Sequence, residues 1–341
     1  MPSPGMAGNR LKSRRSLPFF FSMAGCARRC IYCDQSRITG VGTAPEPADI
    51  RRRVGGLDGP AEVAFFGGSF TCLPAERMEA CLQALKGAPP GSSLRLSTHP
   101  LCLSPEAIRL LKGLSATSCP VSCVELGISS LEDRVLENCG RGYSGEQALA
   151  ALDLLLAEGL PAGVQLMVGL PGQDEDSSLD DLRRIAALKG PRAMDIRVYP
   201  CLVLSGTPLE KLWIAGRYEP LSIESAARRT GLLLREALAL GFNVLRVGLA
   251  ETASLSGSVV SGPHHPAFGE LAWGDCLARM LAGGSPAGPW VEHSRWRSFL
   301  AGHGKWGMRR LSELTGIPLD EVETSLSFWP SRHVPRKGHL G

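Results

Sequence analysis

Residues 25–35 constrain this 341-residue chain more than any other stretch, because they hold Cys26, Cys30 and Cys33 at C-x3-C-x2-C spacing. Thiolates are soft ligands, and this spacing lets one loop wrap several sulfurs around an iron–sulfur cluster. No fourth cysteine continues the pattern, so a four-iron cluster held here would keep one iron without a protein ligand. An open coordination position is a place for chemistry, as it is at catalytic zinc sites.

A zinc site and a chance spacing are the alternatives to a cluster. The chain has 11 cysteines, and that number makes some close spacings accidental. Zinc knuckles usually carry a second C-x2-C pair or histidines downstream, and neither follows this loop. The pattern therefore favours the redox cluster.

The remaining composition places few limits on function. An odd number of cysteines without a secretory signal indicates a reducing cytoplasm, where free thiols are ordinary core residues. The apolar run 17–21 is too short for a signal peptide or a membrane span, so no membrane contact is expected. The net charge of +4 does not by itself indicate nucleic-acid binding. Residues 1–16 are predicted to be a basic tail, either solvated or in contact with an anion.

Apolar strand-like segments alternate with helix-like segments along most of the chain. The predicted strands are residues 17–23, 62–66, 94–98, 123–128, 163–168, 194–199 and 242–247. Helices are predicted between them, the longest over residues 222–240. Such alternation predicts parallel βαβ units with right-handed crossovers.

Four of these strands carry polar or small residues at alternate positions, so one face of the sheet is polar. Those residues are Arg95, Ser97, Glu125, Gly127, Ser129, Gln165, Gly169, Asp195, Arg197 and Tyr199. A closed eight-stranded barrel would instead fill its interior with apolar side chains. We predict an α/β fold with a partial, TIM-like (β/α) barrel of about six parallel strands, helices outside and a polar lumen. A sheet with one solvent-facing side is the alternative.

Two parts follow the predicted tail. Residues 17–250 are expected to form the core domain, and residues 251–341 a C-terminal extension or small cap. Ligands in α/β folds bind at the carboxyl ends of the strands. The cysteine loop and residues 67–69, 97–99, 129–130, 169–172 and 199–201 all follow predicted strands.

With these strand-end motifs, the chain resembles the radical S-adenosylmethionine (SAM) superfamily. Within it, the chain is similar to the radical domain of the Elongator catalytic subunit family, in a short bacterial form. The resemblance extends over residues 17–275. It is carried by residues 25–40, 65–71, 124–130, 140–142, 169–172 and 199–208.

The resemblance implies a 4Fe–4S cluster with three irons ligated by Cys26, Cys30 and Cys33 and with SAM on the fourth. Arg141 would pair with the SAM carboxylate, a geometry that suits guanidinium. The other implied cofactor contacts are Tyr32 near the adenine, Gly67, Gly68 and Ser69 at the amino group, and Ser97, Ser129, Gln165 and Gly169. Reductive cleavage of SAM would release a 5′-deoxyadenosyl radical that abstracts hydrogen from a substrate carbon.

Glu125, Arg197 and Tyr199 on the polar face are the candidate catalytic residues, through contact with the substrate; a structural network in the lumen is the alternative. The resemblance implies tRNA or another RNA as substrate, and a one-electron donor such as flavodoxin or ferredoxin. Residues 169–173 also resemble oxygen-independent coproporphyrinogen oxidase, so a radical oxidase of a small molecule is a second hypothesis. A cluster- or heme-binding protein without turnover is the third.

The chain departs from the family pattern at several positions. The family has glutamine at Ser129, histidine at Tyr143, asparagine at Asp34, arginine at His99 and an acidic residue at Ser97. The family also appends an acetyltransferase domain, for which residues 276–341 offer no room, so acetyl-dependent chemistry is not expected. Trp290, Trp296 and Trp306 are either core or a stacking surface for nucleic acid. The other cysteines mostly look structural, and Cys201, at the barrel mouth, is the better candidate for a reactive thiol.

Overall fold

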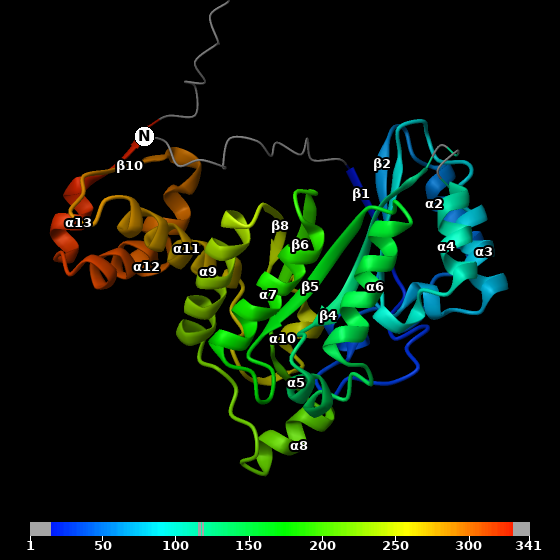
Figure 1. The fold of residues 1–341 in the computed structure, drawn as a ribbon, viewed down its shortest axis with the longest axis horizontal. Coiled ribbons are helices and arrows are strands. Elements are labelled where there is room, and N and C mark those ends of the chain that lie inside the picture. The colour runs from blue at the N-terminus through cyan, green and yellow to red at the C-terminus, as the bar shows by residue number, and fades with distance from the viewer. Residues whose placement is uncertain (1–14, 115–116, 118, 330–341) are drawn as a thin grey trace, which may run out of the picture.

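The computed structural model describes residues 15–114, 117 and 119–329, and seven parallel strands form its central sheet (Figure 1). They are β1 Arg15–Phe20, β2 Ala61–Phe66, β3 Ser93–Thr98, β4 Val121–Ser129, β5 Ala162–Val168, β6 Met194–Pro200 and β8 Phe242–Val247. Each pairs in parallel with the next in the order β1-β2-β3-β4-β5-β6-β8. No pairing in the described chain joins β1 to β8, so the curved sheet is a half-barrel. The predicted fold class is confirmed, and the first strand begins at Arg15, inside the predicted tail.

Helices follow the strands and cover the outer face of the sheet (Figure 1). The larger ones are α2 Pro47–Gly55, α3 Ala75–Gln83, α4 Pro105–Gly113, α6 Gly145–Ala157, α7 Glu175–Lys189 and α9 Ile223–Ala239. The short ones are α1 Gln35–Thr39, α5 Asp133–Asn138, α8 Pro208–Ile214 and α10 Ala253–Ser256. Two 3-10 turns, Phe70–Cys72 and Pro100–Cys102, follow β2 and β3.

Local capping explains where the predicted helices begin. Ser144 and Gln147 form a capping box at the start of α6, and Asp174 and Ser177 form another at α7. These reciprocal bonds satisfy the first free backbone N–H groups of each helix. The main hydrophobic core lies between the helices and the apolar face of the sheet, where residues such as Leu96 and Leu126 are fully buried.

The C-terminal part is more helical than its glycine-rich sequence suggests. It comprises β9 Val259–Ser261, which pairs antiparallel with β7 Val203–Leu204, then α11 Phe268–Gly284, β10 Trp290–His293, α12 Arg297–Thr315, α13 Leu319–Ser325 and β11 Leu326–Trp329. Figure 1 shows α12, α13 and β10 as a lobe beyond α9 and α11. Phe268 of α11 belongs to the main core, whereas Leu277 belongs to a second, smaller core with Leu300 and Leu311.

One expectation for these helices is wrong, and one alternative left open for the tryptophans is settled. The predicted longest helix, α9, has 17 residues, as does α11, and α12 spans 19 with four non-helical residues inside it, 302–305. The indole N–H groups of Trp290 and Trp306 donate to the carbonyls of Ser285 and Leu271, at 2.8 and 2.9 Å. These two tryptophans are therefore packed in the lobe. Across the described residues, no helix has both the length and the apolar character that crossing a membrane requires.

Candidate functional site

A cavity of about 640 Å³ lies at the carboxyl end of the half-barrel. This volume is within the range of about 300–1,000 Å³ that small-molecule sites usually have. Most of the predicted site residues line it: Cys26, Cys30, Tyr32, Cys33, Gly67, Gly68, Ser69, Ser97, Ser129, Arg141, Gln165, Arg197 and Tyr199. The fold thus brings together residues from six strand ends, because parallel strands present their carboxyl ends at one edge.

Gly169 lies elsewhere, although the resemblance placed it on the cofactor. Its N–H donates to Gln173 Oε1 at 2.9 Å, and its carbonyl accepts from the Tyr218 hydroxyl at 2.7 Å. It lines a second cavity, of about 490 Å³, together with Arg217 and Arg229. Both polar backbone groups of Gly169 are therefore engaged, and its expected contact with the cofactor is corrected.

The cysteine loop connects β1 to α1 and presents its three sulfurs to the main cavity. Cys26 Sγ lies 3.5 Å from Ser69 Oγ, and Cys30 Sγ accepts from Arg141 Nη1 at 2.8 Å. The Cys33 N–H closes the loop by donating to the Cys30 carbonyl at 3.0 Å. These three thiols are partly exposed, whereas the other six unpaired cysteines are buried. The loop is thus the place where unpaired sulfur reaches the cavity.

The glycine turn after β2 is fastened to the cysteine loop. Gln35 Oε1 accepts from the N–H of Gly68 at 2.6 Å and from the N–H of Met23 at 2.8 Å. The Ser69 N–H donates to the Ala24 carbonyl at 2.8 Å. Gly68 has a φ of +59°, and an added Cβ would lie 2.2 Å from the Ala24 carbonyl oxygen. Only glycine fits there, and Gln35, to which sequence reasoning assigned no role, joins the two segments.

The donor set fits an iron–sulfur cluster. Burial, followed by the charges of Cys30 and Cys26, raises the pKa of Cys33 to about 12, and burial raises that of Cys26. Three thiolates here therefore require a strongly cationic partner, which cluster iron supplies. No three His, Cys, Asp or Glu side chains in the described segments converge as they would on one metal ion. Three thiolates that line the same cavity can hold a cluster of several irons.

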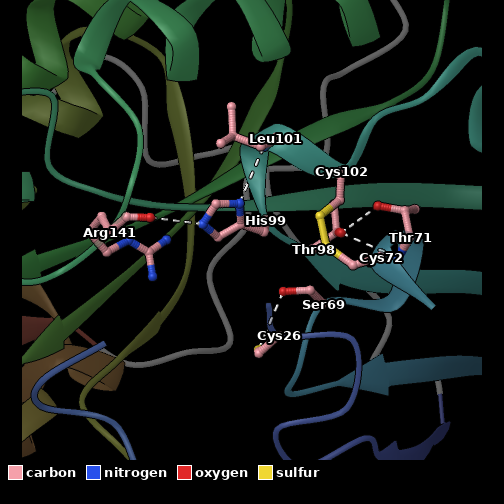
Figure 2. The surroundings of a disulfide bond; sticks show 9 residues. All are labelled: Cys26, Ser69, Thr71, Cys72, Thr98, His99, Leu101, Cys102 and Arg141. Atoms are coloured by element: carbon pink, nitrogen blue, oxygen red, sulfur yellow. Dashed lines mark hydrogen bonds between the residues drawn. A yellow bond between two sulfur atoms is a disulfide. The ribbon is translucent and has the colours of Figure 1, made fainter. Parts of the chain in front are cut away.

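Arg141, beside Cys30 in the cavity wall, is held by two residues that differ from the family pattern. Its Nε donates to the Tyr143 hydroxyl at 2.9 Å, and that hydroxyl donates to the Ile128 carbonyl at 2.6 Å. His99 Nδ1 accepts from the Leu101 N–H, which leaves Nε2, 3.3 Å from the Arg141 carbonyl, to donate (Figure 2). Burial, and then the charge of Arg141, lower the pKa of His99 to about 4. His99 is therefore neutral near pH 7 and does not repel the guanidinium.

Glu125 is the centre of a buried network rather than part of the cavity wall. It is 1% exposed and accepts from Arg95 Nη1 at 2.7 Å, Arg197 Nε at 2.9 Å and Gln165 Nε2 at 3.0 Å. Arg95 also donates to Asp195 at 2.8 Å. The predicted polar face of the sheet is thus confirmed by this network. Because its oxygens are engaged, the expected substrate contact of Glu125 is corrected to a role in positioning Arg197.

Arg197 and Tyr199 do reach the cavity, as does the pair formed by Tyr32 and Ser129. The hydroxyls of Tyr32 and Ser129 lie 3.0 Å apart. Ser129 has a φ of +67°, which costs energy for a residue other than glycine, and such strained residues cluster at functional sites. The strand end after β4 is therefore shaped to place a small hydroxyl against Tyr32.

Two expectations about the other cysteines are wrong. Cys201 is 1% exposed, and burial raises its pKa to about 12, so it is not a reactive thiol. The expected reducing cytoplasm implied free thiols throughout, but Cys72 and Cys102 form a disulfide, and both line the cavity (Figure 2). Their pairing depends on the turns after β2 and β3 lying side by side, which cysteine spacing alone does not reveal.

Replacing Gly68 with alanine is expected to weaken SAM binding at least about tenfold. A left-handed alanine costs about 1–2 kcal/mol, which corresponds to about tenfold in affinity. The added Cβ would also push against the Ala24 carbonyl and shift the cysteine loop. Equilibrium dialysis against SAM measures the loss. Gly87→Ala is the matched control, because nothing lies within 4 Å of a Cβ there. Equal affinity of the two variants would contradict this account of the glycine turn.

Family models match most of the chain. The model described as the radical SAM superfamily matches residues 21–185, and the model of the radical SAM C-terminal domain matches residues 194–275. The second match ends inside α11, so this family's pattern extends beyond β8 into the helix that packs on α9.

Curated relatives match over a part of their own length. The tRNA uridine(34) acetyltransferase of Methanocaldococcus jannaschii is 30% identical over 195 residues, covering 51% of this chain and 35% of that protein. Elongator complex protein 3 of Dictyostelium discoideum is 23% identical over 247 residues, covering 68% of this chain and 43% of that protein. This chain therefore spans less than half the length of these two relatives.

A solved structure has the same fold. It is the archaeal Elp3 of Methanocaldococcus infernus with an N-terminal deletion, matched with a TM-score of 0.56 and 22% identity. The match covers 78% of this chain and 63% of that one. At this level of identity the likeness concerns the arrangement of strands and helices.

Proposed function

The chain belongs to the radical SAM superfamily, whose enzymes use a 4Fe–4S cluster and SAM, and from this premise we propose that it modifies RNA, most simply tRNA. When bound, these cofactors supply a 5′-deoxyadenosyl radical that removes hydrogen from a carbon atom. We further propose that the protein works in the cytoplasm with a one-electron donor such as flavodoxin or ferredoxin. The acetyl transfer in the names of its relatives is not part of the proposal.

The residues around the cavity take distinct roles in this proposal. Cys26, Cys30 and Cys33 hold three irons. Arg141 pairs with the SAM carboxylate, since its guanidinium faces the cavity and has no carboxylate partner in the described chain. The hydroxyl of Ser69 and the carbonyls of the glycine turn accept from the SAM amino group.

One further set of residues contacts the rest of the cofactor, and another contacts the substrate. Tyr32 packs beside the adenine, while Ser97, Ser129 and Gln165 offer polar contacts to the cofactor. Tyr199 contacts the substrate together with Arg197. Arg197 is held for this task by Glu125 and by the Phe66 ring, whose centroid lies 5.0 Å from its guanidinium carbon. Arginine positioned in this way can bind a phosphate or an exposed base.

The observation that carries the RNA proposal is the charge of the cavity wall. Arg28, Arg141, Arg197 and Arg246 line the cavity, and no Asp or Glu of the described chain does. Of these four, Arg197 alone forms an ion pair within the described residues. After one arginine serves the SAM carboxylate, Arg28 and Arg246 remain at the exposed mouth for an anionic substrate. RNA phosphates are such groups.

Replacing Arg246 with glutamate is expected to weaken tRNA binding about tenfold. It should also reduce the slope of log affinity against log salt concentration by about 1, the value for one lost phosphate contact. Arg246 makes one described hydrogen bond, from Nε to the Gly248 carbonyl at 3.0 Å, so its other donors are available. SAM affinity should stay unchanged. Filter binding across a salt series measures the effect, with Arg109→Glu on α4 as the control outside the cavity. An equal loss of tRNA affinity in both variants would contradict a contact between Arg246 and tRNA at the cavity mouth.

The release of 5′-deoxyadenosine tests the proposed function. The protein is reconstituted with iron and sulfide without oxygen, reduced, and supplied with SAM, with and without bulk tRNA. We expect tRNA to stimulate release. Stimulation by coproporphyrinogen but not by tRNA would favour a small-molecule oxidase instead. No release, with cluster and SAM both bound, would favour a binding protein without turnover.

A further inference from the structure

We propose that Cys72 and Cys102 are a reversible thiol–disulfide site in the wall of the cofactor cavity, and that their oxidation state sets the affinity for SAM. The proposal goes beyond the proposed function and does not depend on which substrate the enzyme uses. It assigns the pair a chemical partner, a dithiol reductant or a small disulfide oxidant, which reaches the two sulfurs through the cavity.

The position of the pair makes it open to chemical exchange. Cys72 and Cys102 are bonded with a Cα–Cα distance of 5.0 Å, inside the range of about 4.4–6.8 Å for disulfides. Both are partly exposed and line the cavity, whereas every unpaired cysteine outside the cysteine loop is buried. Disulfides in proteins of reducing compartments are usually transient and redox-sensing or catalytic. An accessible pair at a cofactor site fits that class.

One half of the pair is connected to the cysteine loop. Cys72 ends the 3-10 turn after the glycine motif, and its N–H donates to the Ser69 carbonyl at 2.9 Å. Ser69 Oγ in turn lies 3.5 Å from Cys26 Sγ (Figure 2). A shift of Cys72 is therefore passed to a hydroxyl that touches a cluster ligand and, in our assignment, the SAM amino group.

The other half is connected to the arginine assigned to the SAM carboxylate. The Cys102 N–H donates to the His99 carbonyl at 3.0 Å, and His99 Nε2 lies 3.3 Å from the Arg141 carbonyl. Figure 2 shows the disulfide beside His99 and above Ser69. The bond thus joins two turns that hold the two ends of the amino-acid part of SAM.

Without the disulfide, the two turns keep a weaker connection. Thr71 and Thr98 remain in contact, with hydroxyl oxygens 2.5 Å apart and the Thr71 N–H 3.3 Å from Thr98 Oγ1. Reduction should therefore loosen the turns without separating them. Because a rigid, pre-formed site loses less entropy on binding, the disulfide form should bind SAM more tightly.

A dithiol reduces the Cys72–Cys102 bond by thiol–disulfide exchange, a two-electron change. A thiolate of the dithiol attacks one sulfur of the pair, the S–S bond breaks, and a mixed disulfide forms. The second thiol of the reagent then attacks the mixed disulfide, so that the reagent becomes a cyclic disulfide. Cys72 and Cys102 are released as thiols, each with one proton. Oxidised glutathione reverses the two-electron change and departs as two glutathione thiols.

The first measurement uses the wild-type protein with its cluster, poised without oxygen at a series of ratios of reduced to oxidised dithiothreitol. Samples are quenched in acid, alkylated with a maleimide and digested for mass spectrometry. We expect the peptides of Cys72 and Cys102 to be linked at the oxidising end and alkylated together at the reducing end. Absence of the linked peptide, or alkylation of the two residues at different ratios, would overturn the proposal.

The second measurement is the Kd for SAM at both ends of the series, expressed per intact cluster from its absorbance. We expect about fivefold tighter binding in the oxidised protein, the lower end of the usual range for coupled sites. The double variant Cys72→Ser, Cys102→Ser should bind equally at both ends. The matched control Cys81→Ser, a buried unpaired cysteine on α3, should keep the difference. An equal Kd in the wild type, or a difference that persists in the double variant, would refute the coupling.

Discussion

Replacing Cys30 with alanine is expected to abolish the iron–sulfur cluster and, with it, all cleavage of SAM. The cysteine loop offers three sulfurs to the cavity, and Cys30 is the one that also accepts a hydrogen bond from Arg141, at 2.8 Å. Two thiolates cannot hold a cluster that already leaves one iron without a cysteine. Iron content should fall from about four per chain to a background level, with loss of the brown colour.

Cys81→Ala is the matched control for this variant, because it removes the same sulfur atom from a buried position on α3, outside the cavity wall. Circular dichroism of both variants separates loss of the cluster from loss of the fold. If the iron and the colour survive in Cys30→Ala, the ligand assignment is wrong. If both variants lose the cluster, general destabilisation is the cause, and Cys30 is not specifically required.

Replacing Glu125 with alanine is expected to lower the free energy of unfolding by about 3–5 kcal/mol, the usual cost of removing one partner of a buried ion pair. The substitution leaves Arg197, which has no other ion pair in the described chain, without compensation. Arg95 keeps Glu62 and Asp195 but loses its contact of 2.7 Å. Urea denaturation of the wild type and the variant measures the difference.

The exposed ion pair of Glu106 and Arg109 on α4 provides the comparison. Glu106→Ala should cost less than about 1 kcal/mol, as surface ion pairs usually do. A loss of similar size in both variants would contradict the view that Glu125 organises the lumen. A stable Glu125→Ala protein that binds cofactor normally but has lost substrate turnover would instead restore Glu125 as a substrate contact.

The sequence was informative where local spacing decides the structure. The C-x3-C-x2-C loop indicated the sulfur site because chain connectivity alone keeps its ligands together. Alternation of polar and apolar residues along the strands indicated the polar lumen, because strand side chains point to opposite faces. The positions of Arg95, Glu125 and Arg197 in one network follow from that rule once the strands lie in chain order.

Features that depend on contacts between distant turns were missed or misplaced. The pairing of Cys72 with Cys102 requires two turns 30 residues apart to lie side by side. Gly169 follows a strand, as the cofactor contacts do, yet its turn bends toward the second cavity and bonds to Gln173 and Tyr218. Strand-end position thus predicts the edge of the sheet at which a residue lies, but it does not predict the cavity that the residue faces.

The most direct test of the central claim is electron paramagnetic resonance of the reduced, reconstituted protein with and without SAM. The account predicts the signal of a reduced 4Fe–4S cluster whose g values shift when SAM is added, because SAM would bind the iron that no cysteine ligates. A cluster signal that stays unchanged at saturating SAM would contradict the open iron. A reconstituted protein without any cluster signal would contradict the assignment of Cys26, Cys30 and Cys33.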